Sequence, residues 1–231
     1  MTIKQLTQDL YIIRGLVNVY VLETADGLAV LDTGFPNSTP KILDGVRALG
    51  RQPSDVRHIV LTHAHPDHIG SAAALKRETG ATVWAHPIDA PIIEAGTGFR
   101  HVEASPGLRN RILTQLLLGL VTAVEPTKVD RFIEDGDSPP FLPDLIAMHA
   151  PGHCAGQIAF LWRRHGGVLF TADTCVNQFG LKLPVALEDI ALARKSLASL
   201  AKLDFEMICV MHGRPITSGG DTIFRRTSFD R

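Results

Sequence analysis

The sequence has few cysteines, no long hydrophobic run and almost no excess of either charge. Its 3 cysteines, Cys154, Cys175 and Cys209, form no CxxC pair, so a disulfide framework of the kind that stabilises small secreted domains is not expected. The most apolar stretch, residues 112–124, is broken by Thr, Gln and Gly and is too short to cross a bilayer. We therefore expect neither a disulfide-rich protein nor a membrane protein.

The first residues of the sequence do not have the pattern of a secretory leader, and we expect none. Residues 1–10, MTIKQLTQDL, lack a charged segment followed by an apolar segment and a small-residue cleavage site. Together with the odd number of cysteines, this pattern favours a reducing environment. We therefore expect a cytoplasmic protein.

Positive and negative charges nearly cancel. There are 23 Lys and Arg residues against 24 Asp and Glu residues, which leaves a formal net charge of -1. Binding to nucleic acid or to an anionic membrane depends on a basic excess that this sequence does not have. We expect a small-molecule partner instead.

The sequence pattern predicts strands interspersed with helices along the 231 residues, 45% of which are hydrophobic. Short β-branched or alternating runs predict strands, and apolar residues at helical spacing predict helices. Strands are expected at residues 11–13, 17–23, 28–32, 56–61, 81–85, 131–134, 145–150, 157–162, 168–171 and 207–211, and helices at 40–49, 71–78, 108–124 and 187–200. No repeat or linker interrupts this order, so a single α/β domain over residues 1–231 is expected.

Residues 96–128 differ from the rest of the chain, because a segment with Gly and Pro leads into a leucine-rich helix. We interpret them as a helical insertion whose apolar side packs on the main body and shapes a substrate pocket. A homodimer contact along the helix is the alternative. The insertion carries Arg100, Arg109, Arg111 and Lys128, which outnumber its acidic residues and suggest a substrate with a carboxylate.

Histidine and aspartate are concentrated in one loop, which reads THAHPDH over residues 62–68. These residue types are rarely buried together without a ligand, since protonated histidines repel one another. A metal ion removes this penalty. His63 and His65 would face the same side of an extended segment, whereas Asp67 and His68 begin a helix and can turn toward a second ion.

Three further candidate ligands follow predicted strands. His153 comes after the strand at 145–150 in a turn that contains Pro and Gly, Asp173 follows the strand at 168–171, and His212 follows the strand at 207–211. Loops at strand ends commonly carry functional residues, and these three would meet the histidine cluster at one edge of a folded sheet. Cys154, beside His153, is interpreted as a small buried hydrophobic residue rather than a ligand.

Five segments of the chain resemble the motifs of a known family. They are DTG at 32–34, HxHxDH at 63–68, PGH at 151–153, ADT at 172–174 and MHG at 211–213, in order. Together they resemble the five motifs of the metallo-beta-lactamase superfamily, and they span most of the chain. The resemblance implies a four-layer αββα sandwich with a metal centre in a shallow groove at one edge of the two sheets.

The same resemblance implies a role for each motif residue. One ion is held by His63, His65 and His153, the other by Asp67, His68 and His212, and Asp173 bridges them. A hydroxide shared by the two ions would attack a carbonyl group, with Asp67 orienting it and passing a proton. Asp32 would hold a ligand histidine or shape the loop beneath the site. Two zinc ions are the first expectation, with iron or manganese as alternatives.

Departures from known members narrow the expected reaction. Lactam-cleaving members generally lack the bridging carboxylate that this sequence has at Asp173. Glyoxalase-II-like thioesterases add a C-terminal helical segment, for which residues 213–231 are too few. Many homoserine-lactone hydrolases have a tyrosine after the bridging aspartate, whereas the tyrosines of this sequence are Tyr11 and Tyr20. We therefore expect neither activity in its usual form. We expect a dinuclear metal-dependent hydrolase that cleaves an ester, lactone or thioester.

Two alternatives to this hydrolase remain. One is a mononuclear iron enzyme that resembles sulfur dioxygenases, because the ligands of those enzymes are a subset of the seven. The other is a non-enzymatic metal-binding module. It is disfavoured because structural zinc sites are closed by four ligands, whereas this pattern leaves open coordination positions.

Overall fold

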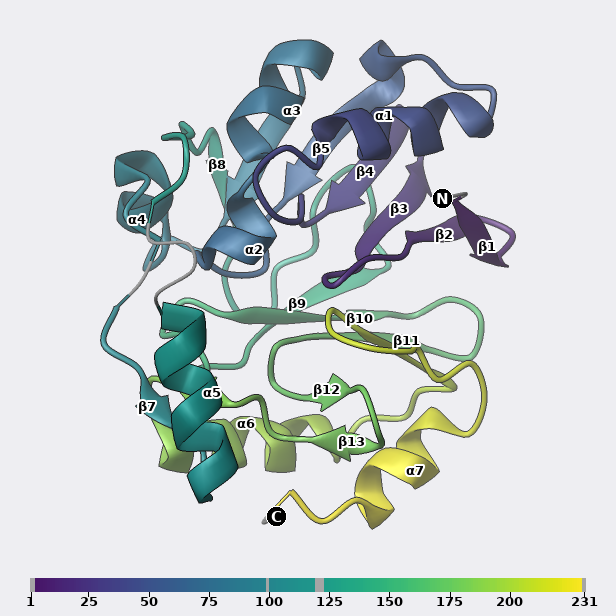
Figure 1. Ribbon diagram of the computed structural model, residues 1–231. Helices are drawn as coiled ribbons and strands as arrows, with labels where there is room; N and C mark the ends of the chain where they lie inside the picture. Colours follow the sequence, from purple (N-terminus) through teal and green to yellow (C-terminus); the bar gives the residue numbers. More distant parts are fainter. Residues whose placement is uncertain (1–2, 99, 119–122, 230–231) are drawn as a thin grey trace.

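The computed structural model describes residues 3–98, 100–118 and 123–229, which form two β-sheets packed face to face between two layers of helices (Figure 1). The first sheet has the strand order β1-β2-β3-β4-β5-β6-β8, and the second has the order β15-β11-β10-β9. This αββα arrangement confirms the expected fold class.

The expected strands are all present, and their ends differ from the expected ones by at most two residues. The first sheet contains β1 (Lys4–Thr7), β2 (Leu10–Ile13), β3 (Val19–Thr24), β4 (Gly27–Leu31), β5 (Val56–Val60), β6 (Thr82–Ala85) and β8 (Arg131–Phe132), and the second contains β9 (Leu145–His149), β10 (Ile158–Trp162), β11 (Val168–Ala172) and β15 (Met207–Val210). Strand β1 and two short ribbons were not expected. The ribbons pair β12 (Val176–Asn177) with β13 (Leu181–Lys182) and β7 (Glu103–Ala104) with β14 (Ala186–Leu187).

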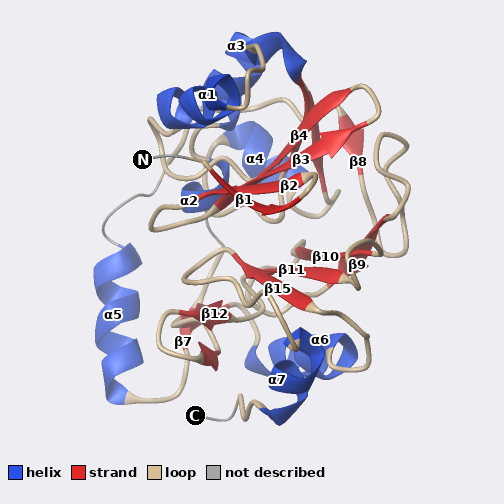
Figure 2. Ribbon diagram, turned by 90° about the vertical axis from the view of Figure 1, so that its right-hand side faces the viewer, coloured by secondary structure: helices blue, strands red, loops and turns tan. Residues whose placement is uncertain are grey.

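The helices cover the outer faces of the sandwich. Figures 1 and 2 show α1 (Thr39–Ala48) and α3 (Ala72–Thr79) over the first sheet and α6 (Ile190–Leu200) and α7 (Gly220–Arg226) over the second. The 3₁₀ turn Pro53–Asp55, α2 (Pro66–Ile69) and α4 (Ala90–Ala95) lie in connections, and these short elements, like α7, contain too few residues to show a helical period. Among the described helices, none combines the length and apolar character needed to cross a membrane.

Both faces of the second sheet are buried, and the alternation along its central strand shows why. Ile158, Phe160 and Trp162 of β10 point into the core between the two sheets. Ala159 and Leu161 point the other way and pack beneath the helices α6 and α7. Because side chains alternate across a strand, one continuous apolar run supplies both layers.

The first sheet repeats this division. Val19 and Val21 of β3 pack in the core beneath α1 and α3, whereas Tyr20 and Leu22 pack in the core between the sheets. The Tyr20 hydroxyl donates to the Val210 carbonyl oxygen at 2.8 Å, which joins β3 to the last strand of the second sheet. The two sheets are thus held together by apolar burial and by a buried hydrogen bond between them.

The insertion is attached to the edge of the second half of the molecule. Its helix α5 (Leu108–Leu118) begins where expected, but Ala123 and Val124 are not helical, so the expected end at 124 is wrong; residues 119–122 lie outside the described residues. Ser105 N and Thr114 Oγ1 both donate to the Val185 carbonyl oxygen, at 2.8 and 2.9 Å. Figure 2 shows α5 standing beside the half of the molecule that contains the second sheet and the short ribbons.

The topology brings several loops to the same end of the sandwich. β4, β5 and β6 run parallel, as do β11 and β15, so the loops after β4, β5, β11 and β15 leave from carboxyl ends of parallel strands. Such loops carry ligand sites in α/β folds, because rigid strands position them. The candidate ligands all lie in loops of this kind or in the turn after β9.

The core between the sheets gives a first prediction. Phe160→Ala removes a fully buried ring, and we expect the free energy of unfolding to fall by about 3–5 kcal/mol. Phe179 is 90% exposed, so Phe179→Ala is a matched control that should change stability by no more than about 0.5 kcal/mol. The free energy of unfolding is measured by urea denaturation. An equal decrease in both variants would contradict the assignment of Phe160 to the core between the sheets.

Candidate metal centre

The loop after β5 presents the four clustered residues in two geometries. His63 lies in a bend and His65 in extended backbone before α2, and Pro66 occupies the first helical position, where its fixed φ suits a helix start. Asp67 and His68 lie in that first turn, and His68 N donates to the His65 carbonyl oxygen at 2.9 Å. The loop therefore directs two side chains from the segment before α2 and two from the helix itself.

Close backbone approaches position the other candidate ligands. A Cβ atom at Gly152 would lie 2.2 Å from Ala193 N, and φ is +134° there, so glycine is required in the turn before His153. Asp173 follows an irregularity in the β11–β15 pairing, and Ala172 has a φ of 46°. This strained turn after β11 redirects the chain, and it carries the Asp173 side chain into the site.

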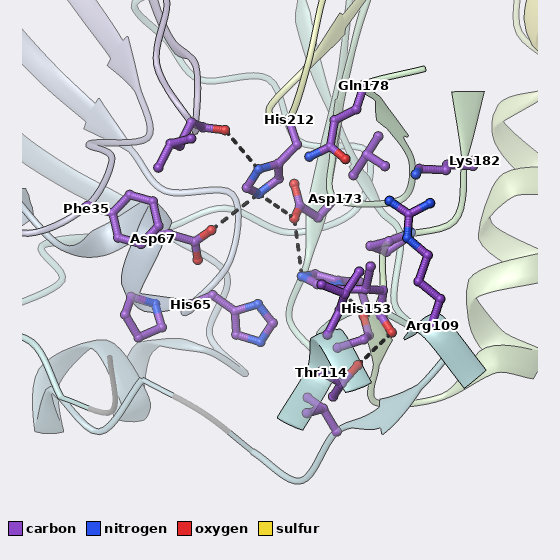
Figure 3. A pocket seen from close by; sticks show the side chains of 18 residues that line it. Phe35, His65, Asp67, Arg109, Thr114, His153, Asp173, Gln178, Lys182 and His212 are labelled. Atoms are coloured by element: carbon purple, nitrogen blue, oxygen red, sulfur yellow. Dashed lines mark hydrogen bonds and ion pairs between the residues drawn. The ribbon is translucent and has the colours of Figure 1, made fainter. Parts of the chain in front are cut away.

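The carboxylate of Asp173 lies at the centre of the cluster (Figure 3). Its Oδ2 atom is 3.1 Å from His212 Nε2, 3.5 Å from His153 Nε2 and 3.6 Å from His68 Nε2. The structure thus brings together side chains that are far apart in sequence, and one oxygen faces imidazoles from three different loops.

The seven candidate ligands fall into two sets of three around this carboxylate. In each set the donor atoms lie within 4.8 Å of one another; the sets are His63, His65 and His153, and Asp67, His68 and His212. A third combination that meets the same limit, His63, His68 and Asp173, crosses between the two sets. The structure therefore groups the residues in the way that the motifs implied, with Asp173 between the groups.

Hydrogen bonds on the far side of three rings determine which nitrogen faces the site. Nδ1 of His68 donates to Asp32 Oδ2 at 2.7 Å, Nδ1 of His153 to the Ala186 carbonyl oxygen at 2.8 Å, and Nδ1 of His212 to the Leu16 carbonyl oxygen at 3.1 Å. An acceptor at Nδ1 requires the proton on that atom, which leaves the Nε2 lone pair for the site. Each ring is held in the orientation that a metal ligand needs.

Asp32 lies fully buried beneath the cluster, as the sequence suggested. Besides the bond to His68, its carboxylate accepts from the backbone N and the hydroxyl of Thr62, both at 2.8 Å. The Thr62 hydroxyl is also 3.0 Å from His63 Nδ1. Asp32 therefore connects the loop after β4 to ligand residues of both sets.

Buried polar atoms test whether these residues fit a metal. Among the described residues, His68 Nε2, His153 Nε2 and Asp173 Oδ1 are buried without a hydrogen-bond partner. Burying polar atoms in this state costs free energy, and native proteins rarely leave several together. All three belong to the cluster, and a cation would satisfy them together. The donor set of imidazoles and carboxylates fits a divalent transition metal.

The electrostatic environment differs between the two sets of candidate ligands. Burial and the neighbouring histidines lower the pKa of His63 and His65 well below the usual value, which favours neutral imidazoles. Burial alone would lower the pKa of His212 as well, but Asp173 and Asp67 raise it to about 10. A field this negative around Asp173 attracts cations.

A second buried carboxylate, Asp89, connects the two histidine loops and was missed by sequence reasoning. Its Oδ2 atom accepts from Ala64 N at 2.9 Å, and its Oδ1 atom accepts from Gly156 N at 3.0 Å and from Arg100 Nη1 at 2.7 Å. A Cβ atom at position 156 would lie 2.4 Å from Asp89 Oδ1, so glycine leaves the space that the carboxylate occupies. No motif marks Asp89, because its partners come from remote segments.

Cys154 belongs to this network and is more than a small hydrophobic residue. Its thiol donates to Asp89 Oδ2 at 3.2 Å and accepts from Arg100 at 3.3 Å. The set His65, Cys154 and Glu188 also meets the distance limit for a metal, but burial and the nearby Asp89 and Glu188 raise the pKa of the thiol well above its usual value. A protonated thiol is a poor metal ligand, so we assign it to the structural network.

The fold and the site define a class, a metal-dependent hydrolase with an αββα sandwich. The chain belongs to the metallo-beta-lactamase superfamily, whose family model matches residues 12–212. It is 25% identical over 221 residues to "Probable metallo-hydrolase YflN" of Bacillus subtilis, with 87% of this chain and 82% of that protein covered. It is 26% identical over 232 residues to an N-acyl homoserine lactonase of Bacillus sp, with 88% and 80% covered.

Two further similarities place the chain within the family. The uncharacterized protein YobT of Bacillus subtilis is 28% identical over 154 residues, and the matched region covers 66% of this chain and 60% of that protein. The crystal structure of BJP-1, a subclass B3 metallo-beta-lactamase of Bradyrhizobium japonicum, superposes with a TM-score of 0.72 at 25% identity and covers 96% of this chain and 87% of that one.

The Asp89 network leads to a second prediction. Asp89→Asn removes the charge and replaces one acceptor oxygen by a donor, so it cannot hold both histidine loops, and we expect zinc affinity to fall roughly 10–100-fold. Asp130→Asn is the control, because Asp130 likewise accepts a backbone N–H, from Val83, and a cation, from Lys76, but lies outside the cluster. Competition titration with a chromogenic chelator measures both variants. A wild-type affinity in Asp89→Asn would show that the network does not support the site.

Proposed function

We propose that this protein is a dinuclear metal-dependent hydrolase that cleaves an ester, thioester or lactone. The observation that carries the proposal is the position of Asp173 Oδ2, which lies within 3.6 Å of Nε2 atoms from both sets of candidate ligands. A carboxylate in that position can serve two ions at once. His63, His65 and His153 would hold one ion, and Asp67, His68 and His212 would hold the other.

The bound ions would supply a Lewis acid for the substrate carbonyl and a water acidified at neutral pH. Zinc is the metal that we propose, because imidazoles predominate among the ligands. The chain's own residues orient the reacting groups. The Asp67 carboxylate lines the pocket with Oδ2 3.3 Å from His212 Nε2, where it can accept a hydrogen bond from the attacking water.

A pocket of about 480 Å³ adjoins the cluster and is of a size that suits a small-molecule substrate. Its lining includes His65, Asp67, Asp173 and Phe35 (Figure 3). Apolar side chains, among them Phe35 and Leu113, form much of this lining. Apolar walls exclude bulk water and bind the uncharged part of a substrate. The pocket therefore supports selection of an organic substrate with an apolar body.

The side chains around the site favour direct attack by water. Thr114 is the hydroxyl residue that lines the pocket among the described residues, and its Oγ1 atom donates to the Val185 carbonyl oxygen. Burial raises the pKa of the Cys175 thiol to about 12, which leaves it protonated. Without an activated Ser or Cys, the proposed reaction needs no covalent acyl intermediate. The similarity to an N-acyl homoserine lactonase supports an acyl substrate.

Metal analysis with a substrate panel tests this proposal. We expect two zinc ions per chain, hydrolysis of a lactone or thioester in preference to a phosphodiester and a β-lactam, and loss of activity on chelation that zinc restores. One iron per chain with oxygen uptake would support the mononuclear dioxygenase alternative. A fully loaded protein without turnover would support the binding module, and hydrolysis of the phosphodiester alone would overturn the substrate class.

Asp67→Asn tests the orienting role within this reaction. The amide has lost the negative charge that aligns the water, and we expect kcat to fall roughly 100-fold or more. Asp44→Asn is the control, since the Asp44 side chain is 73% exposed on α1. Metal content is measured in each preparation, so that loss of an ion is separated from loss of orientation. Unaltered turnover in Asp67→Asn would remove this residue from the reaction.

A further inference from the structure

We propose that Arg109 and Lys182 form a subsite for an anionic group of the substrate. The proposal rests on the proposed function and adds a substrate class to it: an ester, thioester or lactone with a carboxylate, phosphate or similar oxyanion away from the scissile bond. Both residues line the pocket of the metal cluster. In Figure 3 they lie across the pocket from Phe35 and His65.

The charges of both side chains are left unpaired by the protein. Within the described part of the chain, the side chain of neither Arg109 nor Lys182 makes a hydrogen bond or an ion pair. The acidic residues among the pocket lining are Asp67 and Asp173, and both of them face histidines of the cluster. Two cations beside an apolar wall, without an acid of their own, are suited to bind an incoming anion.

Both residues are directed into the pocket by regular structure. Arg109 and Leu113 are one helical turn apart on α5, and both line the pocket. Lys182 of β13 pairs with Val176 of β12, which also lines the pocket. The bond from Thr114 Oγ1 to the Val185 carbonyl oxygen, at 2.9 Å, ties α5 to the segment that follows β13. The relative position of the two cations is thus set by secondary structure.

The remaining basic residues of the insertion have other roles or positions. Arg100 is paired with Asp89 at 2.7 Å and donates to the Ile88 carbonyl oxygen at 2.6 Å. Arg111 is exposed on α5 and does not line the pocket. Of the basic residues of the insertion, Arg109 is therefore the one that lines the pocket, and Lys182, which lies outside the insertion, lines it as well. Gln178, an exposed lining residue, can donate a further hydrogen bond from its amide.

Paired thioesters test the subsite. In one pair the acyl chain ends in a carboxylate or in the isosteric carboxamide, and in a second pair the same difference is placed on the thiol. We expect wild-type kcat/KM to favour the anionic member of one pair, and Arg109→Gln or Lys182→Gln to lower that preference roughly tenfold, mainly through KM. Arg111→Gln on the same helix is the control and should leave the preference unchanged. A phosphonate in place of the carboxylate shows which oxyanion binds better.

The outcomes separate this proposal from the proposed function. Hydrolysis of charged and neutral thioesters without a preference in either pair would overturn the subsite and leave the hydrolase standing. A preference that survives in the Arg109→Gln, Lys182→Gln double variant would also overturn it. Absence of hydrolysis of every thioester and lactone in the metal-loaded protein would instead contradict the proposed function. A preference that falls in both single variants and is retained in Arg111→Gln supports the subsite.

Discussion

The structure depends on one constraint, the burial of imidazoles and carboxylates in contact with one another. Several of their polar atoms have no hydrogen-bond partner within the protein, and Asp173 faces three imidazoles with a single oxygen. Such a cluster is costly in a low-dielectric interior unless a cation occupies it. The same arrangement that costs stability without an ion provides a preformed site for one. The same side chains therefore affect both the stability of the protein and its capacity to bind a cation.

The αββα sandwich makes this cluster possible by holding loops from both sheets at one end. Two buried carboxylates then fix the loops to one another: Asp32 holds Thr62 and His68, and Asp89 holds the backbone at Ala64 and Gly156. Asp32 contacts the candidate ligand His68 directly, whereas Asp89 contacts the backbone next to candidate ligands, and neither carboxylate lines the pocket. The insertion contributes to the Asp89 network and to the pocket, because Arg100 pairs with Asp89 and residues of α5 line the pocket. The wall of the pocket and the network beside the candidate ligands are thus joined through residues 100–114.

Sequence patterns were accurate where the structure depends on local periodicity. The long apolar strands of the sandwich were expected with ends correct to two residues, and α1, α3 and α6 were expected from their spacing. The end of α5 was wrong, and β1, α4, α7 and the short ribbons were missed. These elements are short or lie at edges, where tertiary contacts rather than periodicity decide the conformation. Among site residues, motif spacing identified Asp32 and the seven clustered side chains but not Asp89 or Lys182.

The sequence by itself determined the family, the order of the sandwich strands along the chain and the set of candidate ligand side chains, because motifs and alternation are properties of short segments. Tertiary structure alone decided that Asp89 joins the backbone at Ala64 and Gly156, that it engages Arg100, and that Arg109 and Lys182 line the same pocket. These relations join remote segments; Ala64 and Gly156, for example, are about 90 residues apart in the sequence. They follow from how the sheets pack and how the loops leave them, and no local pattern in the chain encodes that packing.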